Sequence, residues 1–229
     1  KEKLRKLGYQ PSPVDPCLFT KKIGDSFSFV FIYVDDGGAM GKKKAIEDTM
    51  KGLSAKFTIK RMGPLEQFVG CVMTMNKEKD TMWVHQPKLL GHLKEKFAEE
   101  VPNRTVYTPA ATSYSVVKPQ PEEPLISAEL QSRYRMGVGM LLYLVKLSRP
   151  EIANATRELT KVLEGATPGH YKAMLGTIKF VLETERLGLC LRPEMVKGNA
   201  LFTLKGLCDS DYAGDKDTRI SVYGFILYL

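Results

Sequence analysis

The sequence predicts an α+β fold with antiparallel hairpins and covering helices in the first hundred residues, helices in the middle and a strand pair at the end. The first sign is an apolar run at 26–34, rich in Phe, Val, Ile and Tyr, that ends in Asp-Asp-Gly-Gly. The second is a change to helical spacing of apolar residues from Ser127 onward, and the third is a return to strand-like runs after Gly188. A hydrophobic content of 43% in 229 residues is enough for a buried core.

The apolar run at 26–34 predicts a strand that is buried on both faces, because it is continuously apolar rather than alternating. Asp and Gly favour turn conformations, so residues 35–38 predict a hairpin turn. The glycines Gly37 and Gly38 are expected to weaken the returning strand. Residues 42–56 predict an amphipathic helix packed on this sheet, with apolar residues at helical spacing: Ile46, Met50, Leu53 and Phe57.

A second hairpin is predicted by the alternating residues at 69–76, followed after a polar turn by a strand at 81–85. Trp83, the only tryptophan, is expected in the core. Prolines and a lack of periodicity at 101–124 predict a linker, with a domain boundary near it. Pro87 suits the first turn of a helix, whose apolar stripe is Leu89, Leu90, Leu93 and Phe97.

Three helices are predicted in the middle of the chain. Ser127 is a candidate N-cap for the first, Pro150 opens the second, and Thr167 caps the third ahead of a proline. Gly137 and Gly139 in the first helix are expected to let a neighbouring backbone approach closely, although glycine lowers helix propensity.

Two final strands are expected at 200–208 and 223–229, with an acidic turn between them. The chain starts with Lys1 and stops inside the last apolar run, so both ends are expected to be cut from a longer chain. The four cysteines are isolated, without the close pairs of a zinc site or a disulfide framework. They are interpreted as reduced core residues: Cys17, Cys71, Cys190 and Cys208.

The charge favours a polyanionic partner without identifying one. Lys and Arg outnumber Asp and Glu by 34 to 26, which gives a net charge of +8, a value met both in nucleic-acid-binding proteins and in unrelated soluble proteins. No apolar run approaches the roughly 20 residues of a membrane span, and the N-terminus lacks the pattern of a signal peptide. An intracellular protein with no membrane partner is therefore expected.

Two adjacent carboxylates, Asp35 and Asp36, mark the tip of the first predicted hairpin. Like charges repel beside an apolar strand, and a divalent cation between them would offset that repulsion. Mg²⁺ is commonly held by one or two carboxylates together with substrate phosphates, which is the arrangement that phosphoryl transfer needs. The alternative is a solvated Asp-Asp-Gly-Gly turn, and the two carboxylates by themselves favour that alternative.

The wider sequence resembles the Pol polyprotein of copia-type LTR retrotransposons. An apolar strand that ends in Tyr33-Val34-Asp35-Asp36 is similar to the metal-binding motif of reverse transcriptases. Further matching segments follow in order along nearly the whole chain, and their number and order make the resemblance specific. They are Leu7-Gly8-Tyr9, Asp15-Pro16-Cys17-Leu18-Phe19, Phe68-Val69-Gly70 with Gln86, Thr108-Pro109, Gly139-Met140-Leu141-Leu142-Tyr143-Leu144, Ser148-Arg149-Pro150-Glu151-Ile152, Pro168-Gly169-His170, Gly188-Leu189, Asp209-Ser210-Asp211-Tyr212-Ala213-Gly214-Asp215 and Arg219-Ile220-Ser221.

The resemblance implies two metal sites. Asp35 would be a metal ligand and Asp36 the neighbouring catalytic carboxylate of the polymerase, with Mg²⁺ or Mn²⁺ as the cofactor. Asp209, which follows a predicted strand, would bind the catalytic metals of an RNase H domain. A calcium-binding EF-hand loop that starts at Asp209 is rejected, because its twelfth position is Ile220 and its flanks are strands. The three histidines lack metal-binding spacing, and His170 is interpreted as structural.

The resemblance also implies contacts with substrates. Tyr33 and Val34 would line the nucleotide and the primer end. The partners of the parent enzyme would be an RNA template, a DNA primer, an RNA–DNA hybrid and deoxynucleotides, in cytoplasmic virus-like particles with the nucleus as a second compartment. A hairpin that grips the primer would contribute Phe68, Gly70 and Gln86.

The chain is expected to have four parts. A further catalytic Asp of the polymerase would precede Lys1, so this chain alone is not expected to polymerise. Two alternatives stay open: a non-catalytic nucleic-acid-binding remnant of a decayed element, and an unrelated metal-dependent hydrolase that uses the paired carboxylates. The four parts are the C-terminal part of a reverse transcriptase palm at 1–100, a linker at 101–126, a helical thumb or connection segment at 127–187, and the start of an RNase H-like domain at 188–229.

Overall fold

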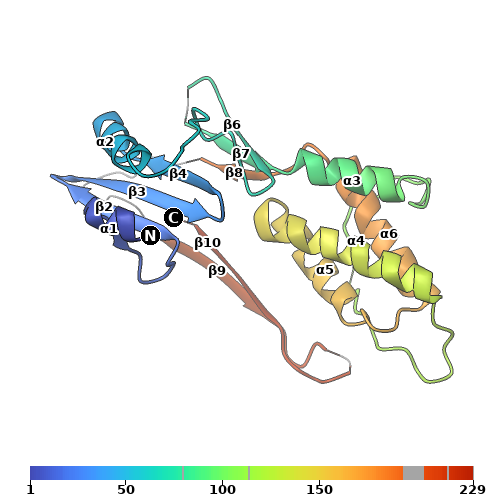
Figure 1. The fold of residues 1–229 in the computed structure, drawn as a ribbon. Coiled ribbons are helices and arrows are strands. Elements are labelled where there is room, and N and C mark those ends of the chain that lie inside the picture. Colours follow the sequence, from blue (N-terminus) through green and yellow to red (C-terminus); the bar gives the residue numbers. More distant parts are fainter. Residues whose placement is uncertain (79, 113, 193–203, 216, 229) are drawn as a thin grey trace. The chain divides into compact units, whose positions relative to one another are not determined.

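The computed structural model describes residues 1–78, 80–112, 114–192, 204–215 and 217–228. It contains α-helices and antiparallel sheets, as the α+β prediction requires (Figure 1). The chain divides into two compact units, Lys1–Phe68 and Val69–Leu229. Among the described residues, no helix has the length and apolar content that crossing a membrane requires.

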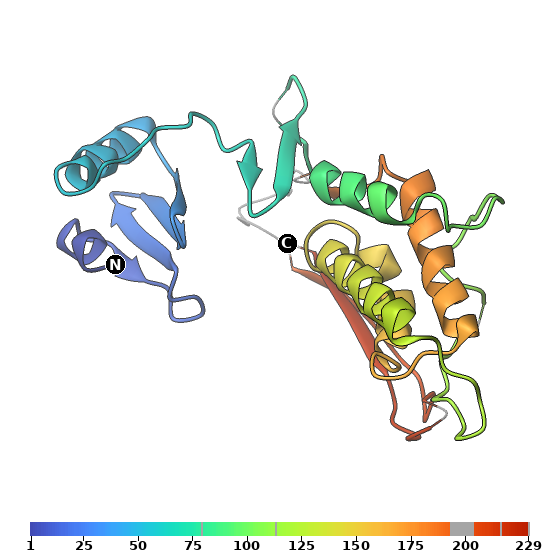
Figure 2. The same cartoon turned by 45° about the vertical axis from the view of Figure 1, so that its right-hand side comes forward.

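The first unit is a four-stranded antiparallel sheet with two helices on one face. Its strands lie in the order β1-β2-β3-β4, and Figure 2 shows both helices on the same side of the sheet. Leu4 from the first helix and Leu53 from the second pack with Phe19 and Val30 in one core. The elements are α1 (Glu2–Lys6), β1 (Gln10–Pro11), β2 (Leu18–Ile23), β3 (Ser26–Tyr33), β4 (Asp36–Met40), α2 (Lys43–Ser54) and β5 (Gln67–Phe68).

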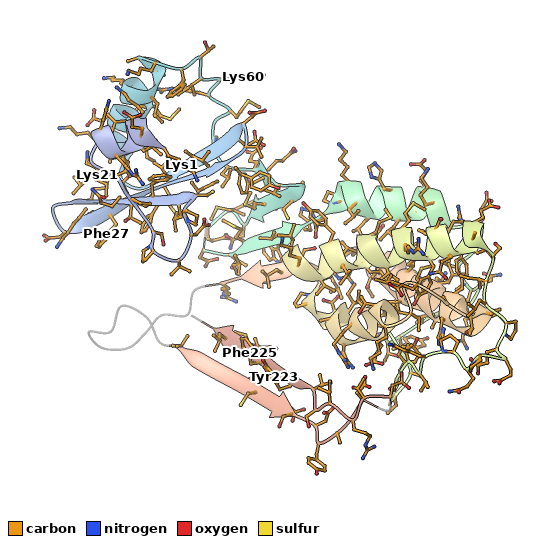
Figure 3. The ribbon with its side chains drawn as sticks, turned by 60° about the horizontal axis from the view of Figure 1, so that its bottom comes forward. Lys1, Lys21, Phe27, Lys60, Tyr223 and Phe225 are labelled. Carbon is orange, nitrogen blue, oxygen red and sulfur yellow. The ribbon has the colours of Figure 1, made fainter. Side chains whose placement is uncertain are left out.

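The prediction that the first apolar strand is buried on both faces is wrong. Only Ser28 and Val30 of β3 are buried, whereas Phe27 and Tyr33 are each 53% exposed. Successive side chains of a strand point to opposite faces, so the even-numbered residues meet the helices and the odd-numbered aromatic residues lie on the other face. Figure 3 labels Phe27 on this strand.

Three buried hydroxyl groups connect β3 to the rest of the first unit. The Tyr9 hydroxyl lies 2.8 Å from Ser28 Oγ and 2.7 Å from Thr49 Oγ1. Thr49 Oγ1 in turn donates to the carbonyl of Ala45, at 2.7 Å. Because Thr49 uses its proton in this way, it accepts from the Tyr9 hydroxyl. The chain of hydrogen bonds fixes α2 against β3, the strand that carries the candidate site.

The second unit combines a small sheet, four packed helices and a separate hairpin (Figures 1 and 2). The predicted second hairpin is confirmed, with Val72 opposite His85. Ser127 Oγ accepts from the backbone N–H of Leu130 at 3.2 Å, and this confirms the predicted N-cap. The elements are β6 (Cys71–Met75), β7 (Met82–His85), α3 (Pro87–Phe97), α4 (Ala128–Leu147), η1 (Pro150–Ile152), α5 (Ala153–Thr160), α6 (Pro168–Glu183), β8 (Leu189–Leu191), β9 (Lys205–Ser210) and β10 (Tyr223–Tyr228).

The helices of the second unit pack around one apolar core. Gly137 of α4 fits closely against its neighbours, because a Cβ there would lie 2.5 Å from the Met174 sulfur and 3.2 Å from Phe97 Cζ. The close neighbours of Gly137 are thus side chains, and not the neighbouring backbone that was predicted. The same prediction for Gly139 is wrong, since a Cβ there would meet nothing within 4 Å.

Described residues of the segment 101–126 make contacts with the helices. Val116 is 2% exposed, and its N–H donates to a Glu158 carboxylate oxygen at 2.7 Å. The Val106 N–H donates to Glu183 at 2.8 Å. This segment belongs to the second unit, Val69–Leu229.

Three expectations about individual side chains and strands need correction. Cys190 and Cys208 are exposed free thiols, and Trp83 is 41% exposed, so none of these three is a core residue. Strand β8 pairs with β7, which places residues 189–191 in the sheet of the second hairpin and not with the final strands. The final pair, β9 and β10, is an antiparallel hairpin with every residue exposed. Residues 200–203 and 229 of the predicted strands lie outside the described residues.

Candidate active site

The candidate site is the tip of the hairpin formed by β3 and β4. Tyr33 pairs with Asp36, so Val34 and Asp35 form a two-residue loop, and the turn lies one residue earlier than predicted. Val34 has a φ of 52°, in the left-handed region that a β-branched residue rarely adopts. Such a conformation costs on the order of 1–3 kcal/mol and persists only where surrounding structure enforces it, which is common at functional sites. The tip is therefore a strained loop that presents two carboxylates.

Both carboxylates of the tip face solvent. Asp35 and Asp36 are exposed, and neither side chain makes a hydrogen bond or an ion pair with any residue in the described part of the chain. The tip is not buried as expected, so water screens the two charges and their mutual repulsion is weak. The exposure leaves their oxygens available, and one or two carboxylates with substrate phosphates and water form a suitable Mg²⁺ ligand set. Within the described ranges, no three His, Cys, Asp or Glu side chains gather closely enough to hold a metal by themselves.

Three aromatic rings support the hairpin from the face of the sheet that the helices leave open. The Phe68 ring meets Phe31 edge-on, with centroids 4.8 Å apart, and meets Tyr33 with centroids 6.0 Å apart. Each such pair contributes about 0.5–1.5 kcal/mol beyond the area it buries. The structure thus places Phe68, for which the sequence implied primer contact, directly against the carboxylate-bearing hairpin. Sequence reasoning missed Phe31, although its position two residues before Tyr33 places it on the same face.

The two glycines after the carboxylates do not interrupt the returning strand. Gly37 pairs with Ile32 and Gly38 with Phe31, and β4 continues to Met40. The Phe31 ring fills the space above Gly38, where a Cβ would lie 2.1 Å from Phe31 Cζ. An aromatic ring that covers a strand glycine in this way restores the packing that the missing side chain would provide.

The remaining predicted site residues lie in the second unit. Gly70 is exposed in a tight turn with Val69, and their φ values are 74° and 48°. Gln86 is only 1% exposed, and its side-chain oxygen accepts from Ser148 Oγ at 2.8 Å, so its amide does not face a solvent-accessible surface. Asp209 is exposed on β9 opposite Gly224. Within the first unit, the structure brings Tyr33, Val34, Asp35, Asp36 and Phe68 together in one place.

The acidic loop between β9 and β10 is held by its own contacts. Lys161 Nζ lies 2.6 Å from an Asp215 oxygen, and the N–H of Thr218 donates to the same carboxylate at 2.8 Å. The Lys161 contact and these hydrogen bonds lower the pKa of Asp215 below its usual range. Asp211 accepts from the Val222 N–H at 2.6 Å. The loop joins two strands, whereas an EF-hand loop joins two helices, so the rejection of an EF-hand is confirmed.

Comparisons with known proteins give relatives that cover almost the whole chain. The chain is 30% identical over 218 residues to the retrovirus-related Pol polyprotein from transposon TNT 1-94 of Nicotiana tabacum, a match that covers 93% of this chain and 16% of the relative. It is 29% identical over 227 residues to the corresponding polyprotein from transposon RE1 of Arabidopsis thaliana. This match covers 97% of this chain and 14% of the relative. An uncharacterized mitochondrial protein of Arabidopsis thaliana is 25% identical over 211 residues. This match covers 88% of this chain and 78% of the relative.

Neither of the other comparisons adds to this result. No family model matches the chain. No solved structure matches it. The two polyproteins are far longer than the aligned segment, since the chain spans about one sixth of their length. The resemblance read from the ordered sequence motifs is nevertheless confirmed at the level of the polyprotein: the chain is a relative of the retrovirus-related Pol polyproteins of plant transposons.

Proposed function

We propose that this chain is the part of a copia-type retrotransposon polyprotein that carries the later half of a reverse transcriptase palm and the first strands of an RNase H domain. The observation that carries the proposal is the strained hairpin tip with two exposed, unpaired carboxylates, Asp35 and Asp36, at the end of an apolar strand. Three of its relatives are Pol polyproteins, which supports a retrotransposon-derived sequence. The parent would add deoxynucleotides to a DNA primer on an RNA template, inside the cell in cytoplasmic virus-like particles or the nucleus.

The proposed chemistry is two-metal phosphoryl transfer. A pair of divalent cations, Mg²⁺ or Mn²⁺, would stabilise the attacking and leaving oxygens when bound. Asp35 and Asp36 would supply carboxylate ligands, and the exposed Tyr33 and Val34 beside them would contact the nucleotide and the primer end. Asp209 would serve the neighbouring RNase H site on the RNA–DNA hybrid.

This chain alone is not expected to polymerise. Two carboxylates are only part of a two-metal ligand set, and a polymerase of this type needs another Asp on an earlier strand. The hairpin of β6 and β7 would still contact the primer, through Gly70 at its exposed entrance rather than through the buried Gln86 side chain.

The test is isothermal titration of Mn²⁺ and Mg²⁺ into the chain in the presence of a primer–template duplex. The variant Asp35→Asn with Asp36→Asn is expected to lose the binding heat of the wild type. The matched control is Asp25→Asn, which removes an exposed carboxylate from the turn between β2 and β3 of the same sheet. Equal binding by all three proteins would sink the proposed metal site.

A second candidate is a non-catalytic nucleic-acid-binding remnant. One observation favours it: the first unit carries 13 of the 34 Lys and Arg residues against 8 of the 26 Asp and Glu residues. Contacts between basic residues and phosphates weaken steeply with salt, whereas metal-dependent binding requires the carboxylates. Duplex binding that falls with salt and is the same in the wild type and the Asp35→Asn, Asp36→Asn variant would favour the remnant.

A further inference from the structure

Helix α4 contacts both ends of the hairpin formed by β6 and β7. The hairpin is entered through Val69 and Gly70 and left through Gln86. Tyr143, near the end of α4, contacts the entrance, and Ser148, which follows the helix, contacts the exit. All five residues belong to the second unit, so the contacts lie within one compact body.

The entrance to the hairpin is a strained turn held by a tyrosine. Val69 and Gly70 have φ values of 48° and 74°, and for the β-branched Val69 this is an unusual conformation. The Tyr143 hydroxyl donates to the Val69 carbonyl at 2.9 Å. The Tyr143 ring also lies beside Gly70, 3.7 Å from the position that a Cβ would take. One side chain from a 20-residue helix therefore fixes both residues of the turn.

The exit from the hairpin is held by a buried hydrogen bond. Ser148 Oγ donates to Gln86 Oε1 at 2.8 Å, and the two residues are 2% and 1% exposed. Ser148 is itself fixed, because its N–H donates to the Leu144 carbonyl at 2.9 Å and ends α4. The Gln86 carbonyl accepts from the Leu90 N–H at 3.1 Å and so begins α3. The exit is thus joined to two helices at once.

We propose that Tyr143 and Ser148 are positioning residues that fix the primer-contacting hairpin of β6 and β7 to helix α4, so that hairpin and helices behave as one body. The proposal rests on the proposed function, since it takes the turn at Gly70 as the primer contact. The proposal differs from the expected domain organisation. It assigns the hairpin of β6 and β7 to the helical body, whereas the sequence placed this hairpin with the rest of the palm segment at 1–100. Neither residue needs to contact substrate.

The test compares Tyr143→Phe with a matched control on the same helix. Tyr134→Phe also removes one tyrosine hydroxyl that donates to a backbone carbonyl, that of Leu159 at 2.8 Å, but this bond joins α4 to α5. Hydrogen–deuterium exchange is measured along the chain, and duplex affinity is measured by fluorescence anisotropy with a labelled primer–template. Ser148→Ala is the second variant, and Tyr143→Phe keeps the test valid should loss of the buried Ser148 hydroxyl unfold the protein.

Tyr143→Phe is expected to speed exchange in β6 and β7 about tenfold, with α5 and α6 unchanged. It should also weaken duplex binding about three- to tenfold. Tyr134→Phe should speed exchange near Leu159. It should leave exchange in the hairpin and the duplex affinity unchanged. Ser148→Ala should act on the hairpin like Tyr143→Phe.

Unchanged hairpin exchange in Tyr143→Phe would overturn the proposal, as would faster exchange with unaltered duplex affinity. A rise in exchange throughout the second unit would also overturn it, because the variant would then act through global stability. Failure of the wild type to bind the duplex at all would instead reject the proposed function. In that case the exchange data alone decide whether α4 holds the hairpin.

Discussion

The ring of Phe31 lies over Gly38 on the neighbouring strand, so that a Cβ at residue 38 would fall 2.1 Å from Phe31 Cζ. The Phe31 ring cannot move away freely, because the Phe68 ring packs against it in an edge-to-face arrangement, with 4.8 Å between centroids. The glycine that follows the carboxylates is therefore required by the packing of an aromatic side chain.

Gly38→Ala is expected to destabilise the first unit by about 1–3 kcal/mol, as extra atoms do in a filled space. Urea denaturation followed by circular dichroism measures the change. In a Phe31→Leu background the same substitution should cost much less, because the ring is absent. A Gly38→Ala effect that is equal in both backgrounds would contradict the packing explanation.

Alanine substitutions at two glycines of helix α4 are expected to change the stability of the second unit in opposite directions. Gly137→Ala would press on Met174 and Phe97 in the core and should destabilise the second unit by about 1–3 kcal/mol. Gly139→Ala meets nothing within 4 Å and should stabilise it by roughly 0.5–1 kcal/mol, because alanine has the higher helix propensity. Thermal melts of the two variants check the prediction, and a shift of the same sign in both would refute it.

Arg149 is expected to be a main stabilising contact between the helices of the second unit. Its side chain is 1% exposed and donates to Thr184 Oγ1 at 2.6 Å, to the Thr184 carbonyl at 3.2 Å and to Glu151. Arg149→Met should cost about 2–3 kcal/mol, near the lower end for breaking a buried ion pair, because Glu151 is 37% exposed and can return to water. Glu151→Gln is the control and should cost below about 1 kcal/mol. Chemical denaturation of both variants measures these differences.

The stability of the second unit is expected to fall as the pH drops below about 6.5, the unperturbed pKa of histidine. Burial lowers the pKa of His170, and its Nδ1 accepts from the Thr167 N–H at 3.1 Å, which requires the neutral ring. Below pH 6.5 the unfolded chain takes up a proton that the folded chain resists, so folding becomes less favourable; above this pH both states are neutral and the contribution is constant.

His170→Gln is the control for this pH dependence, because glutamine also completes a capping box but does not titrate. Melting temperatures of the wild type and the variant are compared between pH 7.5 and 5.5. The difference in melting temperature should be constant near neutral pH. In acid, the melting temperature of the wild type should fall relative to that of the variant. A constant difference over the whole range would show that His170 does not titrate in this way.

Short-range signals were read correctly from the sequence. The start of α3 at Pro87, the N-caps at Ser127 and Thr167 and the hairpin of β6 and β7 follow the predicted order, since each depends on residues a few positions apart. The paired carboxylates were also placed at a hairpin tip, although the turn was shifted by one residue. The metal-binding and substrate-binding roles of these residues remain predictions.

Burial was read less well, because it depends on which faces other elements cover. Phe27 and Tyr33 belong to a continuous apolar run, yet the helices of the first unit cover only the opposite face of β3. Gln86 shows the reverse: a polar residue expected to contact primer is buried under the end of α4. Neither result is visible in a local sequence pattern, since the covering residues lie elsewhere in the chain.

The sequence by itself determined the α+β class, the order of the elements, the hairpin that carries Asp35 and Asp36, and the relationship to transposon Pol polyproteins. Only the tertiary structure decided that Phe68 supports that hairpin, that residues near Val116 pack on the helices, and that the second hairpin is joined to α4. The physical reason is distance along the chain. Periodicity and capping act between neighbours, whereas the Ser148–Gln86 bond joins residues 62 positions apart and exists only once the helices have packed.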